Sequence, residues 1–161
     1  MKRLAFLFAA MPVAAMPQST AQDGVYTSDL ITRWGAGVTP DNVWQSYPRP
    51  QLKRARWQNL NGLWDYAIAP KAAARPQRMD GQILVPFPVE SRLSRVARKV
   101  TPDQRIWYRR SFTVPADWAG EHVMLNFGAV DYAATVLVNG SVVGAHKGGF
   151  STFGFDISPY L

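Results

Sequence analysis

Short apolar runs separated by turn residues recur along the C-terminal part of the chain. The clearest pair, residues 136–138 and 141–143, flanks Asn139-Gly140. An Asn-Gly dipeptide between two apolar runs predicts a β-hairpin with a type I′ turn, because both central residues of that turn need a positive φ. Apolar side chains also fill residues 123–127 and alternate with polar or small ones over residues 153–157, which is typical of half-buried strands. These four strands predict one antiparallel sheet.

The same rhythm extends upstream to residue 61. Residues 63–68, 83–85 and 106–114 are rich in aromatic and β-branched side chains and are bounded by glycine, proline and polar loops, so each predicts a strand. No segment shows a convincing amphipathic helical period. About seven short strands with turns between them indicate an all-β sandwich.

The N-terminus has the features of a secretory signal peptide. Lys2 and Arg3 give a positive start, residues 4–13 are almost wholly apolar, and residues 19–21 offer the small side chains that a signal peptidase requires. Residues 1–21 are therefore expected to be removed, which makes the mature protein periplasmic or secreted; the alternative is a short buried helix. The apolar run is too short to span a bilayer, so no membrane anchor is expected. The chain has no cysteine, and hence neither a lipid-attachment site nor a disulfide.

Residues 22–47 are interpreted as an N-terminal arm, and residues 48–161 as the β-sandwich domain. Glycine and proline are too dense between residues 35 and 50 for a regular element. Large rings in and just after the arm are nevertheless too apolar for a disordered leader; they are Trp34, Trp44, Tyr47 and Trp57. Either these rings dock on a surface that another part of the protein provides, or they line a sugar site, because flat apolar rings stack on pyranose faces.

The formal net charge of +7 falls to about +5 when Lys2 and Arg3 leave with the signal peptide. The basic residues are spread along the chain rather than gathered on one helix or stripe. None of the usual nucleic-acid-binding motifs accompanies them, so the basic surface is interpreted as solvated and no nucleic-acid partner is expected. The remaining 140 residues are enough for one domain with a sizeable core.

A series of short motifs follows one another in a recognisable order. They are PRPQ at residues 48–51, WQNLNGLW at 57–64, VPFPVES at 85–91, WYRR at 107–110, GAVDY at 128–132, VNG at 138–140, HKGGF at 146–150 and FDI at 155–157. This ordered set resembles the N-terminal sugar-binding domain of glycoside hydrolase family 2, the β-galactosidase, β-glucuronidase and β-mannosidase group. The resemblance covers residues 48–161.

The resemblance implies a jelly-roll (galactose-binding-like) β-sandwich. In that family an immunoglobulin-like sandwich and a TIM barrel follow this domain, and the barrel holds the active site. The family reaction is hydrolysis of a β-glycosidic bond with retention, by two glutamates whose carboxyl groups lie about 5–5.5 Å apart. The implied partners are a carbohydrate and the further domains of the same enzyme, and no cofactor is implied.

This sequence contains only two glutamates, and neither matches the catalytic motifs of the family. Glu90 lies in a proline-rich turn and Glu121 directly follows Gly120. No catalytic residue is therefore assigned within the chain. The resemblance also predicts further sandwich strands after Leu161, so we expect an N-terminal fragment of a larger glycosidase, incomplete at its C-terminal strands and inactive alone.

Other polar residues offer no recognisable catalytic or metal site. His122 and His146 are far apart in sequence and lack metal-ligand spacing, so hydrogen-bonded or surface histidines are expected and no metal. Arg109 and Arg110 are adjacent in a predicted strand and point to opposite faces. One of them is expected to be partly buried and to need a carboxylate, for which Asp131 or Glu90 is predicted.

Asp131 and Asp156 complete the set of candidate side chains. Asp131 follows a strand end and is expected to hold a neighbouring loop through backbone N–H groups, and Asp156 lies on the polar side of its strand. For this group of carboxylates and arginines, a structural role and direct contact with substrate both remain open. For the whole chain, the alternative to the front domain of a glycosidase is a secreted carbohydrate-binding module that acts alone, with exposed tryptophan and tyrosine rings as its platform.

Overall fold

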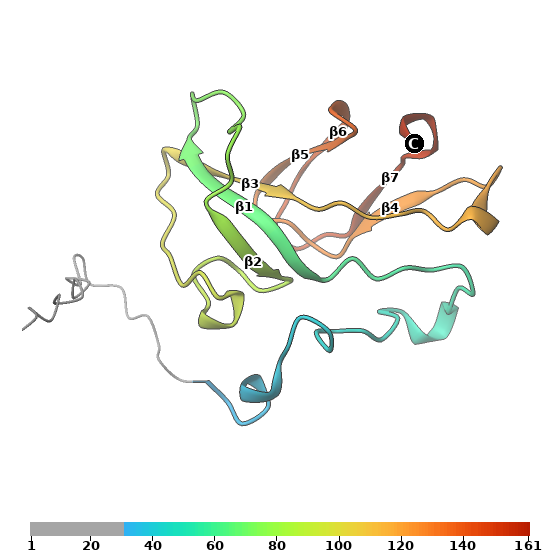
Figure 1. The fold of residues 1–161 in the computed structure, drawn as a ribbon, viewed down its shortest axis with the longest axis horizontal. Helices are drawn as coiled ribbons and strands as arrows, with labels where there is room; N and C mark the ends of the chain where they lie inside the picture. Colours follow the sequence, from blue (N-terminus) through green and yellow to red (C-terminus); the bar gives the residue numbers. More distant parts are fainter. Residues whose placement is uncertain (1–30) are drawn as a thin grey trace, which may run out of the picture.

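The computed structural model describes residues 31–161, and the proposed signal peptide lies outside them. The described chain forms antiparallel strands joined by loops and short 3-10 turns (Figure 1). The strands are β1 (Gly62–Pro70), β2 (Gly81–Val85), β3 (Gln104–Arg109), β4 (Met124–Phe127), β5 (Ala133–Val138), β6 (Ser141–Lys147) and β7 (Phe153–Asp156). The 3-10 turns are η1 (Gly35–Gly37), η2 (Pro50–Leu52), η3 (Arg92–Ser94), η4 (Ala116–Trp118) and η5 (Ser158–Tyr160). The predicted all-β class is confirmed.

The first sheet has the strand order β2-β1-β3, with β1 at its centre. Leu63 pairs with Leu84 on one side of β1, and Ala67 pairs with Trp107 on the other. Ile83 and Leu84 are almost completely buried, as the apolar run at residues 83–85 predicts. These side chains and Ala67 make the core of this sheet.

Strand β3 is shorter than the predicted strand at residues 106–114, because it ends at Arg109. Asp65 is the β1 residue paired with Arg109, and the part of β1 before it pairs with β2. Arg110 then leaves the ladder, and its Nη1 donates to the Leu63 carbonyl at 2.9 Å. The Arg110 side chain thus satisfies a backbone carbonyl of β1 just beyond the end of the β1–β3 ladder.

The hairpin around Asn139-Gly140 is confirmed. β5 and β6 pair antiparallel from either side of the dipeptide, whose φ angles are +49° and +86°. Positive φ at both positions is the requirement of the predicted type I′ turn. The Asn139 side chain also donates from Nδ2 to the Tyr160 carbonyl at 2.7 Å, so the hairpin turn holds η5.

The prediction of a single four-stranded sheet from residues 123–157 was wrong. β4 pairs with β7 and β5 pairs with β6, as two separate antiparallel ladders. The reason lies at Gly144 of β6, where a Cβ would fall 2.3 Å from the ring of Phe155. The Phe155 ring occupies the space beside Gly144, so β6 and β7 meet through a side chain instead of through a shared row of backbone hydrogen bonds.

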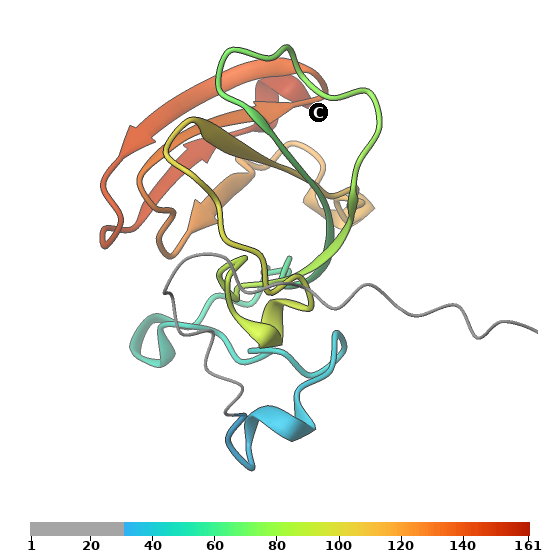
Figure 2. The ribbon, with the colours of Figure 1, turned by 90° about the vertical axis from the view of Figure 1, so that its left-hand side faces the viewer.

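The strands form two groups that face each other (Figure 2). Those of residues 62–109 lie on one side, and those of residues 124–156 on the other. Val136, Val138 and Ile157 are the buried apolar residues of the second group. The two groups with a core from each are the layers of a β-sandwich.

The described part of the arm runs along one side of the strands as an irregular chain with the turn η1, and the turn η2 follows it (Figure 1). Val43 anchors it, with 1% of its surface exposed. Gly35 is also buried, and a Cβ there would lie 3.4 Å from the side chain of Leu93 in η3. The dense glycine and proline therefore give an irregular chain that is packed at particular points. Within residues 31–161 no helix is long and apolar enough to cross a membrane.

Candidate functional site

A groove lies between two stretches of the N-terminal region. Residues 45–47 line one part of it, and residues 53–55 with Trp57 line the other. It is a shallow, open groove of about 540 Å³. The chain turns back on itself at η2, between the two stretches (teal coil in Figure 1). The groove is thus built almost entirely by local sequence around that turn.

Hydrogen bonds and one ion pair hold the groove in place. Asn59 donates from Nδ2 to the Trp44 carbonyl at 2.7 Å, which ties the outgoing and returning stretches together. Arg56 donates from Nη1 to Glu121 at 2.5 Å and so joins the returning stretch to the loop after η4. Val43, two residues before the first stretch, is almost completely buried, so this part of the chain is packed as well.

Two of the four rings singled out in the sequence meet in this groove. Tyr47 and Trp57 pack edge to face, with centroids 5.1 Å apart and planes at 71°. Such a pair fixes the orientation of both rings, and Trp57 still keeps 36% of its surface exposed. Trp34 and Trp44 lie outside the groove and are 71% and 69% exposed. Packing and ligand contact are therefore both available to Trp57.

The groove carries two cations and no acid. Lys53 and Arg54 are both exposed and line it, and neither makes an ion pair or a side-chain hydrogen bond within the described chain. The nearby Arg56 is already paired with Glu121. The other polar side chains in the lining, Gln45 and Ser46, are neutral.

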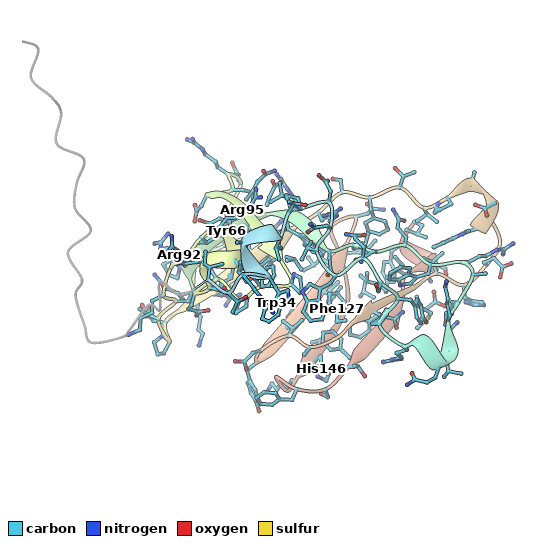
Figure 3. All side chains as sticks on the ribbon, turned by 90° about the horizontal axis from the view of Figure 1, so that it is seen from below. Trp34, Tyr66, Arg92, Arg95, Phe127 and His146 are labelled. Atoms are coloured by element: carbon cyan, nitrogen blue, oxygen red, sulfur yellow. The ribbon has the colours of Figure 1, made fainter. Side chains whose placement is uncertain are left out.

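The two histidines lie in different settings, and the structure does not bring them together. His146 stacks on Phe153 at 4.2 Å between ring centroids, Phe127 stacks on the same ring at 4.7 Å, and His146 Nε2 lies 3.1 Å from the Ser151 hydroxyl. Figure 3 shows His146 and Phe127 well apart from Arg92 and Arg95 of the η3 region. Among residues 31–161 no group of acidic and histidine side chains is arranged to hold a metal.

Asp156 organises the end of the second sandwich layer. Its Oδ1 accepts from the Ser158 hydroxyl at 2.6 Å and from the Ser158 N–H at 2.9 Å, and its Oδ2 lies 2.7 Å from His122 Nδ1. The Ser158 hydroxyl, then the His122 ring and the Ser158 N–H, lower the pKa of Asp156 to about 2. The Ser158 oxygen also accepts from the Val123 N–H at 2.8 Å. This network joins β4, β7 and η5, which is a structural role.

The predicted partner of the arginine pair was wrong. Arg109 pairs with Asp65, at 2.8 Å from Nη2, and Arg110 binds the Leu63 carbonyl. Neither Asp131 nor Glu90 takes part. The sequence did carry a signal for Asp65, since it interrupts the apolar run at residues 63–68 and so faces the polar side of its strand.

Asp131 and Glu90 have other neighbours. The Asp131 carboxylate packs against Gly149, where a Cβ would lie 2.9 Å from Oδ1, so that glycine is required by close approach. Glu90 lies near Tyr108: burial, and then the Glu90 charge, raise the pKa of the tyrosine hydroxyl. Because Glu121 is engaged by Arg56, the two glutamates of the chain serve separate local contacts.

Sequence reasoning missed a buried serine network before β3. Ser94 is fully buried, and its hydroxyl lies 2.6 Å from the Ser91 carbonyl and 3.2 Å from the Val89 carbonyl, while it accepts from the Val96 N–H. The Ser91 hydroxyl caps η3 by accepting from the Leu93 N–H. Two serines three residues apart, which favour such local backbone bonds, were the available signal.

Comparison with known proteins gives one family. Residues 83–161 match the family model described as glycosyl hydrolases family 2, sugar binding domain. The matched residues begin within β2, include β3 to β7 and leave the groove outside. The predicted resemblance to this family is confirmed.

Individual relatives point the same way. The chain is 32% identical over 118 residues to a β-glucuronidase of Paenibacillus borealis, covering 70% of this chain and 20% of that protein. It is 46% identical over 55 residues to a β-galactosidase of Thermoanaerobacter pseudethanolicus, covering 34% of this chain and 7% of that protein. The solved structure of a Faecalibacterium prausnitzii β-glucuronidase matches with a TM-score of 0.53 and 30% identity, over 72% of this chain and 20% of that one. The chain thus spans a fifth or less of the length of these relatives.

Proposed function

Residues 83–161 belong to the sugar-binding domain of the family 2 glycosyl hydrolases, and we propose that the chain serves as the non-catalytic N-terminal domain of a secreted or periplasmic enzyme that hydrolyses β-glycosides with retention. The single observation that carries the proposal is the family match over residues 83–161, from within β2 to beyond β7, whose antiparallel strands the structure contains. Proteins named β-glucuronidase and β-galactosidase are similar to this chain, so glucuronides and galactosides are the first substrates to test.

The positions of the two glutamates bear on whether this domain could carry the catalytic residues. A retaining glycosidase needs an acid/base and a nucleophile facing one bond across about 5–5.5 Å. Glu121 forms a surface ion pair with Arg56, and Glu90 lies beside Tyr108. Glu121 is therefore engaged by a local partner, and in this proposal the domain contributes sugar binding while the chemistry belongs to other domains.

The test is to express the complete reading frame and assay it against chromogenic β-glucuronide, β-galactoside and β-mannoside, with the 161-residue chain alone as control. We expect one substrate to be hydrolysed by the complete product, with the β-anomer released first, and none by the control chain. Glu90→Gln and Glu121→Gln in the complete enzyme should leave the turnover number unchanged. A complete product that binds glycans without hydrolysing any would replace this proposal with the stand-alone binding module.

Export is a separate part of the proposal and rests on residues 1–21. The experiment is to express the chain with its own N-terminus in a Gram-negative host and to sequence the N-terminus of the exported protein. Cleavage after Ala21 leaves Gln22 as the first residue. A product that remains in the cytoplasm and keeps Met1 would refute export. It would leave the assignment of the sugar-binding domain unchanged.

A further inference from the structure

The groove of residues 45–57 combines a fixed aromatic wall with unpaired positive charge, and no role has been assigned to this combination. It lies outside the residues matched to the family model. We propose that this groove binds an anionic sugar unit, a pyranose that carries a carboxylate or a sulfate ester. The inference rests on the proposed carbohydrate binding and adds the site and the charge of the ligand.

The aromatic wall supplies the contact to the sugar ring. The edge of one ring in the Tyr47–Trp57 pair meets the face of the other, so the Trp57 indole is already oriented before any ligand arrives. A ring held this way loses little conformational entropy on binding, which favours affinity. The apolar C–H face of a pyranose is a flat surface of suitable chemistry to lie against the exposed part of Trp57.

The cations determine the charge of the ligand. Lys53 and Arg54 line the same groove as Trp57, while Arg56 points to Glu121 and is neutralised there. A neutral sugar would leave both free cations unused. A carboxylate or sulfate would accept charge-assisted hydrogen bonds from them, and the planar Arg54 guanidinium is suited to bind two such oxygens at once.

The arrangement of charge in the groove favours a sugar over a nucleic acid as its ligand. Lys53 and Arg54 are adjacent, Arg56 is paired with Glu121, and Arg49 does not line the groove, so the groove itself presents one local cluster of charge and no extended basic track for a phosphate backbone. The groove volume of about 540 Å³ suits one or two sugar units. Because the cations are exposed, binding should weaken as salt screens them.

The experiment is a calorimetric titration of the full chain with three probes: methyl β-D-glucuronide, methyl β-D-glucoside and glucose 6-sulfate. The decisive variant is Lys53→Gln/Arg54→Gln. The matched control is Arg98→Gln/Lys99→Gln, which removes the same charge from an exposed, adjacent pair outside the groove. We expect an anionic probe to bind wild type at least about tenfold more tightly than the neutral glucoside. That preference should disappear in the groove variant and persist in the control.

The outcomes distinguish this inference from the proposed function. Tight binding of the glucuronide alone identifies a uronic acid ligand, and binding of the sulfated sugar identifies a sulfated glycan; either result supports the groove. Equal binding of charged and neutral sugars, or equal losses in both double variants, overturns the anionic site and leaves sugar binding intact. If none of the three probes binds, the groove is not a site for an anionic sugar unit. Single-stranded DNA is titrated as a further probe, and a response larger than the response to every sugar would replace the ligand class.

Discussion

Arg109 donates from Nε and Nη2 to the same carboxylate oxygen of Asp65, at 3.2 and 2.8 Å, and the two residues are register partners on β3 and β1. The pair therefore lies across the sheet at the last rung of the β1–β3 ladder. Both side chains are substantially exposed, so solvent weakens their attraction. The contact helps to fix where the ladder ends more than it stabilises the fold.

The first prediction tests that pair. Asp65→Asn should lower the free energy of unfolding by about 0.2–1 kcal/mol, the range of exposed ion pairs. Urea denaturation monitored by circular dichroism gives the measurement. Glu90→Gln is the control, because Glu90 has no contact with Arg109, and an equal loss in that variant would reject the assignment of Asp65 as the partner.

The second prediction concerns the contact between Gly144 and Phe155. Gly144→Ala places a methyl group 2.3 Å from the aromatic ring, so the ring or the strand must shift. We expect a loss of about 1–3 kcal/mol in the free energy of unfolding, as for other overpacked sites. Gly37→Ala adds a methyl group where no atom lies within 4 Å and should cost much less. Adding Phe155→Leu to Gly144→Ala should recover part of the lost free energy of unfolding. The same Phe155→Leu change in wild type should not increase the free energy of unfolding.

The third prediction is a pH dependence that comes from Asp156. Hydrogen bonds from Ser158 and then His122 lower the pKa of this carboxyl from 3.8 to about 2 in the folded protein. A lowered folded-state pKa stabilises the fold above the ordinary value, and that stabilisation is lost as the pH falls from about 4 toward 2. The melting temperature of wild type should therefore approach that of Asp156→Asn over this range.

The control for this pH dependence is Asp117→Asn, on an exposed position of η4 where the carboxylate accepts no hydrogen bond within the described chain. The difference in melting temperature between wild type and this variant should stay constant. If the difference between wild type and Asp156→Asn is also constant from pH 5 to 2, the network around Ser158 does not carry the effect.

The fourth prediction concerns the anchoring of the arm by Val43. Val43→Ala removes buried methyl groups and should cost about 1–3 kcal/mol. It should also loosen the groove, so trypsin should cut after Lys53 and Arg54 faster than in wild type. The matched variant Val142→Ala alters a residue that is 60% exposed and should change neither quantity. Unchanged cleavage in Val43→Ala would show that the arm is held elsewhere.

Local chemistry made the strands predictable from sequence. Asn139-Gly140 has one favourable backbone solution between two apolar runs, and the hairpin formed there as expected. The apolar run containing Ile83 and Leu84 had to be buried on chemical grounds alone. Such features depend on a few residues that are adjacent in the sequence, so they can be predicted from it.

Relations between distant residues were not predictable in the same way. Arg109 pairs with Asp65 instead of Asp131 because the register of β1 and β3 places Asp65 opposite Arg109. The sequence alone does not determine this register, so several carboxylates were possible partners. The split of the second layer depends on where the Phe155 ring lies against Gly144. The groove forms because the chain reverses at η2 and Asn59 donates a hydrogen bond to the Trp44 carbonyl. No single sequence motif predicts this contact.

The ion pair between Arg56 and Glu121 has a consequence for the order in which the chain acquires its structure. The two residues are separated by 65 positions, so the groove leaves the ribosome well before the residue that fastens it. At synthesis rates of about 5–20 residues per second, the interval is roughly 3–13 s. Contacts at such separation close late, because the loop between them must first lose its freedom. The aromatic face of the groove is thus synthesised early, and the ion pair that fastens it closes only after Glu121 has been added to the chain.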